Sequence, residues 1–162
     1  MKIYLGGPMF TAAEVQYNLG LAARLRCFTF EVYCPNENLS VNDKTRSDLT
    51  GEAIYRADIA ELESSNVFLC QVAEDSGTMW EAGYMDCLAR HVDADRYLGS
   101  IGLATDIRLR TPPDPRKSGA DNQAFYLNQF IAGGLKLSLG IYLSEEDLAE
   151  RLLTLAKSRA HD

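Results

Sequence analysis

The chain has 162 residues, of which 46% are hydrophobic and 24% are charged, and its formal net charge is −7. This length is enough for one domain with a sizeable core, and the composition is ordinary for a globular protein. The negative charge, with Lys and Arg scattered along the chain, argues against an extended phosphate-backbone interface. We therefore expect no nucleic-acid partner.

The start of the chain and its Cys and His residues bear on location and metal binding. The first apolar run, at residues 3–5, is far too short for a secretory signal, and no segment approaches the ~20 apolar residues of a membrane span. The four cysteines lack C-x-x-C spacing, which favours reduced and mostly buried thiols. His91 and His161 have no partner at ligand spacing. We expect a cytoplasmic protein without a membrane partner or a bound metal.

Short apolar strands alternate with amphipathic helices along the chain. Strands are expected at residues 2–5, 28–34, 67–72, 97–105 and 137–142, helices at residues 12–26, 49–64, 78–91, 124–133 and 145–157, and polar loops at residues 36–48 and 108–123. Thr11 and Ser144 are expected N-caps of two of the helices. This order predicts an α/β fold, a doubly wound parallel sheet of about five strands with helices on both faces, in a single domain of residues 1–162.

The most informative stretch runs from Asp75 to Tyr84 and joins a buried strand to a helix. It places two carboxylates, Asp75 and Glu81, at a strand-to-helix junction, which is the edge where open α/β sheets bind ligands. Glu81 falls in the first turns of the helix beside large apolar side chains, including Met79, which we expect to line the substrate site. A carboxylate in such surroundings is partly desolvated and can serve as a nucleophile or a general acid/base.

A glycine turn, Gly6-Gly7-Pro8, follows the first strand. It is neither G-x-G-x-x-G nor a Walker A motif, and Pro8 removes a backbone donor, so a phosphate cradle is not favoured. Two interpretations stay open. The turn lets strand and helix pack tightly, or Gly6 forms the floor under a ligand ring that Phe10 contacts.

Two further polar residues allow a structural or a functional interpretation. Asp58 is either a solvent-facing helix acid or part of the site. Asn128 lies in an apolar segment that we expect to be helical. A buried Asn must be hydrogen-bonded, and its partner is either backbone or a ligand hydroxyl. Asp106 and Arg108 are spaced to pair across a turn.

Five segments, taken in order, resemble the nucleoside 2-deoxyribosyltransferases over nearly the whole chain, up to about residue 142. They are residues 3–11, Asp58 before residues 66–69, residues 75–84, residues 105–108 and residues 127–128. The Asp-x5-Glu-x-Gly-Tyr block at residues 75–84 is the most specific of them. The resemblance implies a flavodoxin-like fold and a homo-oligomer, dimer-based as a tetramer or hexamer, whose active sites are shared between subunits.

The resemblance also implies a reaction, the transfer of 2-deoxyribose between purine or pyrimidine bases with retention at C1′. Retention needs two displacements, hence a carboxylate nucleophile and a covalent glycosyl-enzyme intermediate. Glu81 matches the family nucleophile, and Asp58 matches the acid that protonates the leaving base. The implied partners are deoxynucleosides and free nucleobases, and no cofactor is needed.

Further residues match family positions around the substrate. Tyr4 matches a tyrosine that orients the nucleophile, and Asp75 matches an acid that holds a sugar hydroxyl. Asn128 matches an asparagine donated across the subunit interface to the 5′ end of the sugar, and Phe10 matches a residue of the base site.

The chain departs from the family in two places, and two other functions stay open. It ends in a polar helix, where some members end on a tyrosine that reaches the site, and residues 36–48 have no obvious match, so the base preference is open. One alternative is a 2′-deoxynucleoside 5′-monophosphate N-glycosidase, which transfers the sugar to water and for which Arg108 is a candidate phosphate ligand. The other is a non-catalytic nucleotide sensor.

Overall fold

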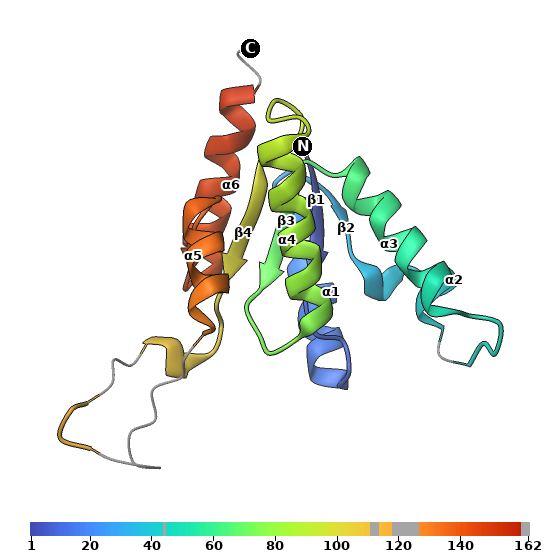
Figure 1. Ribbon diagram of the computed structural model, residues 1–162, viewed down its shortest axis with the longest axis horizontal. Helices are drawn as coiled ribbons and strands as arrows, with labels where there is room; N and C mark the ends of the chain where they lie inside the picture. The colour runs from blue at the N-terminus through green and yellow to red at the C-terminus, as the bar shows by residue number, and fades with distance from the viewer. Residues whose placement is uncertain (44, 111–113, 118–126, 160–162) are drawn as a thin grey trace.

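A five-stranded parallel sheet with the order β2-β1-β3-β4-β5 forms the centre of the molecule (Figure 1). This computed structural model describes residues 1–43, 45–110, 114–117 and 127–159. The strands are β1 (Lys2–Gly6), β2 (Glu31–Tyr33), β3 (Val67–Gln71), β4 (Gly99–Leu103) and β5 (Ile141–Tyr142). The helices are α1 (Ala12–Cys27), α2 (Leu39–Asn42), α3 (Gly51–Ser64), α4 (Ser76–His91), α5 (Gln129–Leu137) and α6 (Glu145–Arg159), with 3-10 turns at Pro35–Glu37 and Ile107–Arg110.

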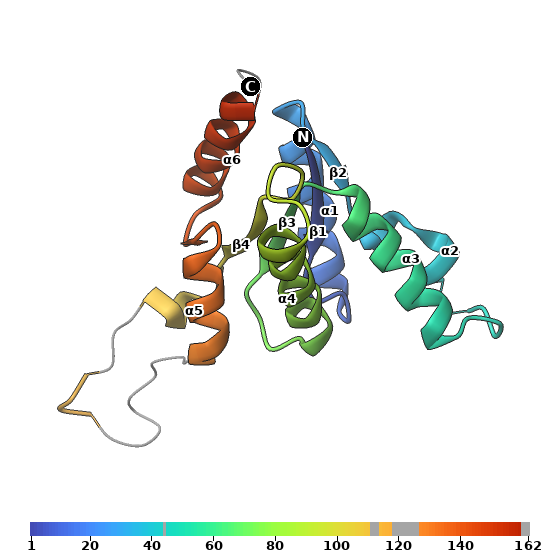
Figure 2. The same cartoon turned by 45° about the horizontal axis from the view of Figure 1, so that its top comes forward.

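Helices cover both faces of the sheet, which explains why every residue of β3 and β4 is buried. Side chains alternate along each strand, so β1 sends Ile3 and Leu5 to one face and Tyr4 to the other. The first face packs against α1 and α6, and the second against α3, α4 and α5. Figure 2 shows α4 in front of the sheet and α1 behind it. The predicted doubly wound α/β fold is confirmed.

The strand order places the topological switch point between β1 and β3, because the chain leaves these neighbouring strands toward opposite faces. Ligands of flavodoxin-like folds bind in the crevice beyond the carboxyl ends of the strands at this point. The Gly6-Gly7-Pro8 turn follows β1, and Asp75 follows β3. The fold therefore brings together two motifs that are far apart in the sequence.

Side-chain caps fix where the helices begin. Thr11 and Glu14 form a capping box at the start of α1, and Ser144 accepts from the Asp147 amide at the start of α6, as predicted. Thr50 caps α3 in the same way. Asp75 caps α4, which begins at Ser76, two residues earlier than the sequence indicated. Asp75 is therefore held by the helix that carries Glu81.

Several predicted boundaries were wrong. The strand predicted at residues 28–34 is only Glu31–Tyr33, because Phe28 caps the C-terminal end of α1 and Thr29 has a positive φ of 69°. Residues 36–48 contain the short helix α2 rather than only a loop. The helix predicted at residues 124–133 is Gln129–Leu137, and the strand predicted from residue 137 is only Ile141–Tyr142. Residues 124–126 of that prediction lie outside the described residues.

The cysteines and the helix lengths give two further findings. All four thiols are free, but only Cys34 and Cys70 are buried, whereas Cys27 and Cys87 are exposed, so the prediction of mostly buried thiols was wrong for two of them. In the part of the chain that the structure describes, none of the helices combines the length and the apolar character that crossing a membrane requires.

Candidate active site

Tyr4, Asp58 and Glu81 come together on the face of the sheet that α3 and α4 cover. The Tyr4 hydroxyl, on β1, donates to Oε1 of Glu81, on α4, at 2.7 Å. Asp58, on α3, has its Oδ1 buried and interacts electrostatically with both groups. Three elements thus deliver one phenol and two carboxylates to a single place, which is the constellation that acid/base or nucleophilic chemistry needs.

An aromatic cluster holds Tyr4 in place. Tyr33 on β2 and Phe68 on β3 are the register partners of Tyr4, and their rings lie 5.0 and 5.5 Å from its ring. Tyr4 itself is completely buried. Its hydroxyl therefore reaches Glu81 from a ring that is packed on both sides, so the hydrogen bond is preorganised. Tyr33 and Phe68 were not predicted from the sequence. Their positions in the two strands expected beside β1 could have indicated that they pack against Tyr4.

The surroundings of Glu81 change its acidity. Burial, with smaller contributions from the negative charges of Asp58 and Asp75, raises the pKa of Glu81 to about 7, while the hydrogen bond from Tyr4 opposes this shift. Burial and the neighbouring Glu81 carboxylate also raise the pKa of Tyr4, which keeps its hydroxyl protonated as a donor. A largely buried carboxyl group that titrates near neutral pH is a candidate for catalysis.

The glycine turn approaches Glu81 closely. A Cβ atom at Gly6 would overlap the Phe68 ring and lie 3.0 Å from Oε2 of Glu81. A Cβ atom at Gly7 would lie 2.7 Å from the side-chain nitrogen of Gln71, on the other face of the sheet. The turn is therefore a thin backbone wall between Glu81 and Gln71, which only glycine allows.

A second group of predicted residues lines a cavity of about 420 Å³ beside the start of α4. Asp75, Met79 and Asn128 all contribute to this cavity, which also contains Leu127 and Ile131. Asp75 accepts hydrogen bonds from the amides of Gly77 and Thr78 and from the Thr78 hydroxyl. Asp75 thus serves as a helix cap while its charge acts on Glu81.

The placement of Asn128 within a helix was wrong. Asn128 is exposed and is the N-cap of α5, where its Oδ1 accepts from the Phe130 amide at 2.9 Å. The hydrogen-bond partner of Asn128 is therefore backbone, one of the two partners considered, although the residue is exposed rather than buried. Its side-chain nitrogen makes no hydrogen bond with any described residue, so the donor group remains available to a ligand in the cavity.

Phe10, Asp106 and Arg108 lie outside both groups. Phe10 is 77% exposed just before α1, and its expected contact with a base stays a prediction. Arg108 pairs with Asp106 across the turn at 2.5–3.0 Å, as one interpretation predicted. Within the described ranges, no three His, Cys, Asp or Glu side chains gather in a way that would hold a metal ion.

The fold and the site define an α/β protein of the flavodoxin-like type with a half-buried carboxylate at its switch point. A sequence model of the nucleoside 2-deoxyribosyltransferase family matches residues 3–95, more than half of the chain. That span includes Tyr4, Asp58, Asp75 and Glu81. The chain therefore belongs to the nucleoside 2-deoxyribosyltransferase family, whose members are enzymes that act on nucleosides and nucleobases.

Relatives extend this match to nearly the full length. An uncharacterized protein of Ureaplasma parvum serovar 3, UU063, is 34% identical over 162 residues, which cover 94% of each chain. The crystal structure of a conserved protein from Enterococcus faecalis V583 is 29% identical, covers 94% of this chain and 97% of its own, and superposes with a TM-score of 0.76. A 2-deoxyribosyltransferase from Bacillus psychrosaccharolyticus, at 17% identity, 92% and 90% coverage and a TM-score of 0.62, shares the fold.

Proposed function

We propose that this enzyme is a nucleoside 2-deoxyribosyltransferase, which moves 2-deoxyribose between purine or pyrimidine bases with retention through a covalent glycosyl-Glu81 intermediate. The observation that carries the proposal is the Glu81 carboxylate, which is largely desolvated and held by the Tyr4 hydroxyl at 2.7 Å. Two displacements at C1′ require a fixed carboxylate nucleophile of this kind. A non-catalytic sensor would need a pocket, but it would not need a carboxylate arranged in this way.

In the first displacement, ionised Glu81 attacks C1′ through an oxocarbenium-like transition state. The bond from C1′ to the base nitrogen breaks, and the base leaves with the electron pair and takes a proton from Asp58. In the second, the incoming base attacks C1′, Glu81 leaves as a carboxylate, and Asp58 accepts the proton of the incoming base. Tyr4 keeps the carboxylate oriented in both steps.

The cavity beside α4 is the proposed place of the sugar. Asp75 would hold a sugar hydroxyl, Asn128 would donate to its 5′ end, and Met79 would contact its apolar face. Gly6, whose backbone lies beside the Glu81 carboxylate, is assigned to the floor of the site, and Phe10 is assigned to the base site. One chain already brings Asp75 and Asn128 to the same cavity, and the donation of Asn128 across an interface stays a prediction.

We further propose a cytoplasmic homo-oligomer with shared active sites. Three large apolar side chains on α4 and α5 are strongly exposed, namely Trp80, Phe130 and Leu137 at 68%, 90% and 77%. Their exposure supports burial against a second copy. The four free thiols support a reducing compartment.

The hydrolase alternative would transfer the sugar of a 5′-monophosphate to water through the same nucleophile. In the sequence, the residue that favoured this hydrolase was Arg108, as a candidate ligand of the 5′-phosphate. Arg108 is bound by Asp106 and lines a different cavity from Asp75 and Asn128. This placement supports a substrate with a free 5′-hydroxyl.

Chromatography of the products tests the proposal directly. Incubation with deoxyinosine or thymidine and free adenine should yield deoxyadenosine. A parallel incubation with a deoxynucleoside monophosphate and no acceptor should release no base. Base release only from the monophosphate would establish the hydrolase instead, and no reaction in either tube would favour the sensor.

The pH profile tests the link between Tyr4 and Glu81. Because the nucleophile must be ionised, kcat/KM should rise as the pH increases through about 7. Tyr4→Phe removes a hydrogen bond that stabilises the carboxylate, so this rise should move to higher pH. Tyr97→Phe is the matched control, since it removes another buried tyrosine hydroxyl, one that donates to the Glu63 carbonyl oxygen. Superimposable profiles for Tyr4→Phe and the wild type would refute the link.

A further inference from the structure

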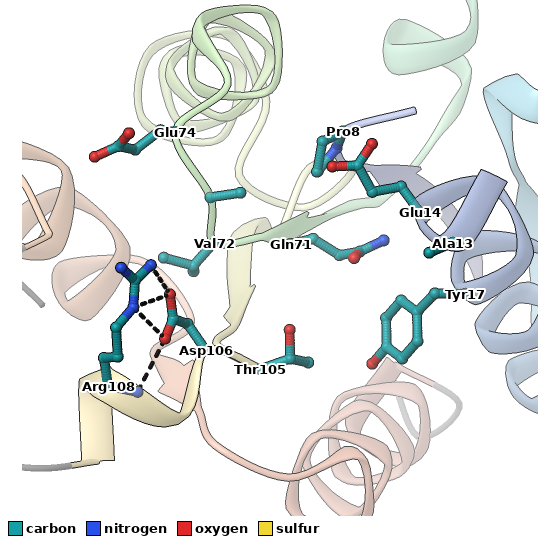
Figure 3. A pocket seen from close by; sticks show the side chains of 11 residues that line it. Pro8, Ala13, Glu14, Tyr17, Gln71, Val72, Glu74, Thr105, Asp106 and Arg108 are labelled. Carbon is teal, nitrogen blue, oxygen red and sulfur yellow. Dashed lines mark hydrogen bonds and ion pairs between the residues drawn. The ribbon is translucent and has the colours of Figure 1, made fainter. Parts of the chain in front are cut away.

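A second cavity, of about 470 Å³, lies at the carboxyl edge of the sheet on the side of α1 (Figure 3). It is lined by the loops after β1, β3 and β4 and by the first turns of α1. Tyr4, Asp58 and Glu81 lie on the other face and do not line it. This volume is within the range of small-molecule sites. The cavity shares Ala73 and Glu74 with the cavity beside α4, but its other lining residues are different, so it can hold a ligand of its own.

Gln71, the last residue of β3, presents an open acceptor to this cavity. Its side chain is 7% exposed and reaches the middle of the cavity (Figure 3). Asn18 donates to the Pro8 and Asn36 oxygens at 3.0 Å, so its own oxygen must accept from Nε2 of Gln71. That network fixes the Gln71 amide and leaves Oε1 without a hydrogen bond from any described residue. This oxygen opens onto the cavity, so a ligand that fills the cavity can donate a hydrogen bond to it.

The charged side chains that line the cavity indicate which kind of hydrogen-bond donor it would bind. Glu14 accepts the amides of Phe10 and Thr11 at 2.9 and 2.8 Å, and these hydrogen bonds hold the pKa of its carboxyl below the usual value. Glu74 lies on another wall, on the same side of the cavity as the Asp106–Arg108 pair, and its carboxylate is directed away from Gln71 (Figure 3). The Asp106–Arg108 pair is neutral overall, so the carboxylates of Glu14 and Glu74 leave the cavity negative.

Apolar surface lies between these carboxylates. Pro8, Val72 and the ring of Tyr17 line the cavity together with the charged groups. A ligand that complements this lining carries positive N–H donors at its ends and a hydrocarbon chain between them. We propose that the cavity binds an organic diamine or a longer polyamine, with its ammonium groups toward Glu14 and Glu74 and one N–H on the Gln71 oxygen.

Isothermal titration calorimetry at low salt tests the proposal, with putrescine and spermidine as probes. Both should bind saturably, and the uncharged diol of the same length as putrescine should not bind. Glu74→Gln removes one exposed carboxylate that makes no hydrogen bond in the described part of the chain, and it should weaken binding by about tenfold. Glu146→Gln, an equal charge change at an exposed position of α6, should leave binding unchanged.

Three results would overturn this proposal: no saturable heat with either amine, equal binding of the diol, or equal losses in Glu74→Gln and Glu146→Gln. The readout is heat of binding, so the result does not depend on whether deoxyribosyl transfer is observed. A protein that binds diamines without transfer activity supports this site and contradicts the proposed function. The reverse result contradicts only this site.

Discussion

Glu81→Gln should lower kcat/KM for deoxyribosyl transfer by more than about a hundredfold, because the amide cannot form the glycosyl ester. Glutamine keeps the shape of the side chain and an oxygen that accepts from Tyr4, so the packing around it should survive. The measurement is the initial rate of deoxyadenosine formation from deoxyinosine and adenine. A variant that retained more than about a hundredth of the wild-type rate would exclude Glu81 as the nucleophile.

The stability of this variant provides the control for folding. The folded-state pKa of Glu81, about 7, lies above its ordinary value of 4.5, so the native state binds the proton more tightly than the unfolded state. The stability that this proton contributes is present below the ordinary pKa and is lost as the pH rises through about 7. Thermal unfolding above neutral pH should therefore show Glu81→Gln to be at least as stable as the wild type. A destabilised variant would mean that lost activity reflects unfolding.

Asp58→Asn should slow the enzyme most with poor leaving groups, by about a hundredfold or more for the least acidic bases. The asparagine cannot deliver a proton, and a base that leaves readily needs none. The test is kcat/KM for a series of deoxynucleosides whose free bases differ in acidity. The dependence on leaving-group acidity should become steeper in the variant.

A second acid on α3 provides the comparison for Asp58. Glu52 is exposed in the first turn of the helix and pairs only with Arg56 at 2.7 Å among the interactions that the structure shows for it. Glu52→Gln should leave the whole series unchanged. If Asp58→Asn slowed good and poor leaving groups equally, its role would be structural rather than that of a general acid.

The sequence was sufficient for the fold and for the desolvation expected of Glu81. The alternation of strands and helices predicted the doubly wound sheet, and Thr11 predicted the start of α1. Glu81 was predicted to be desolvated because Met79 and Trp80 precede it, and its raised pKa agrees. These inferences depend on local periodicity and neighbouring residues, which a single sequence contains.

Features that depend on tertiary contact were not predictable in the same way. Asn128 was expected within an apolar helix, but its side chain is a better cap than an interior residue, and α5 begins after it. The apolar run that follows contains both the end of α5 and β5, and periodicity alone does not separate them. In the sequence Gln71 is one residue of an apolar strand, and only the fold brings Asn18 to its side chain.

The thin wall at Gly6 and Gly7 has a consequence for anyone who wishes to redesign this enzyme. One face of the wall touches the Glu81 carboxylate and the other touches the Gln71 amide, so a methyl group added to either residue meets an occupied space. Directed evolution of base preference should find few acceptable substitutions here. A library of variants is better directed at residues 36–48. In this segment Asn38 donates to the Tyr33 hydroxyl, beside the aromatic cluster.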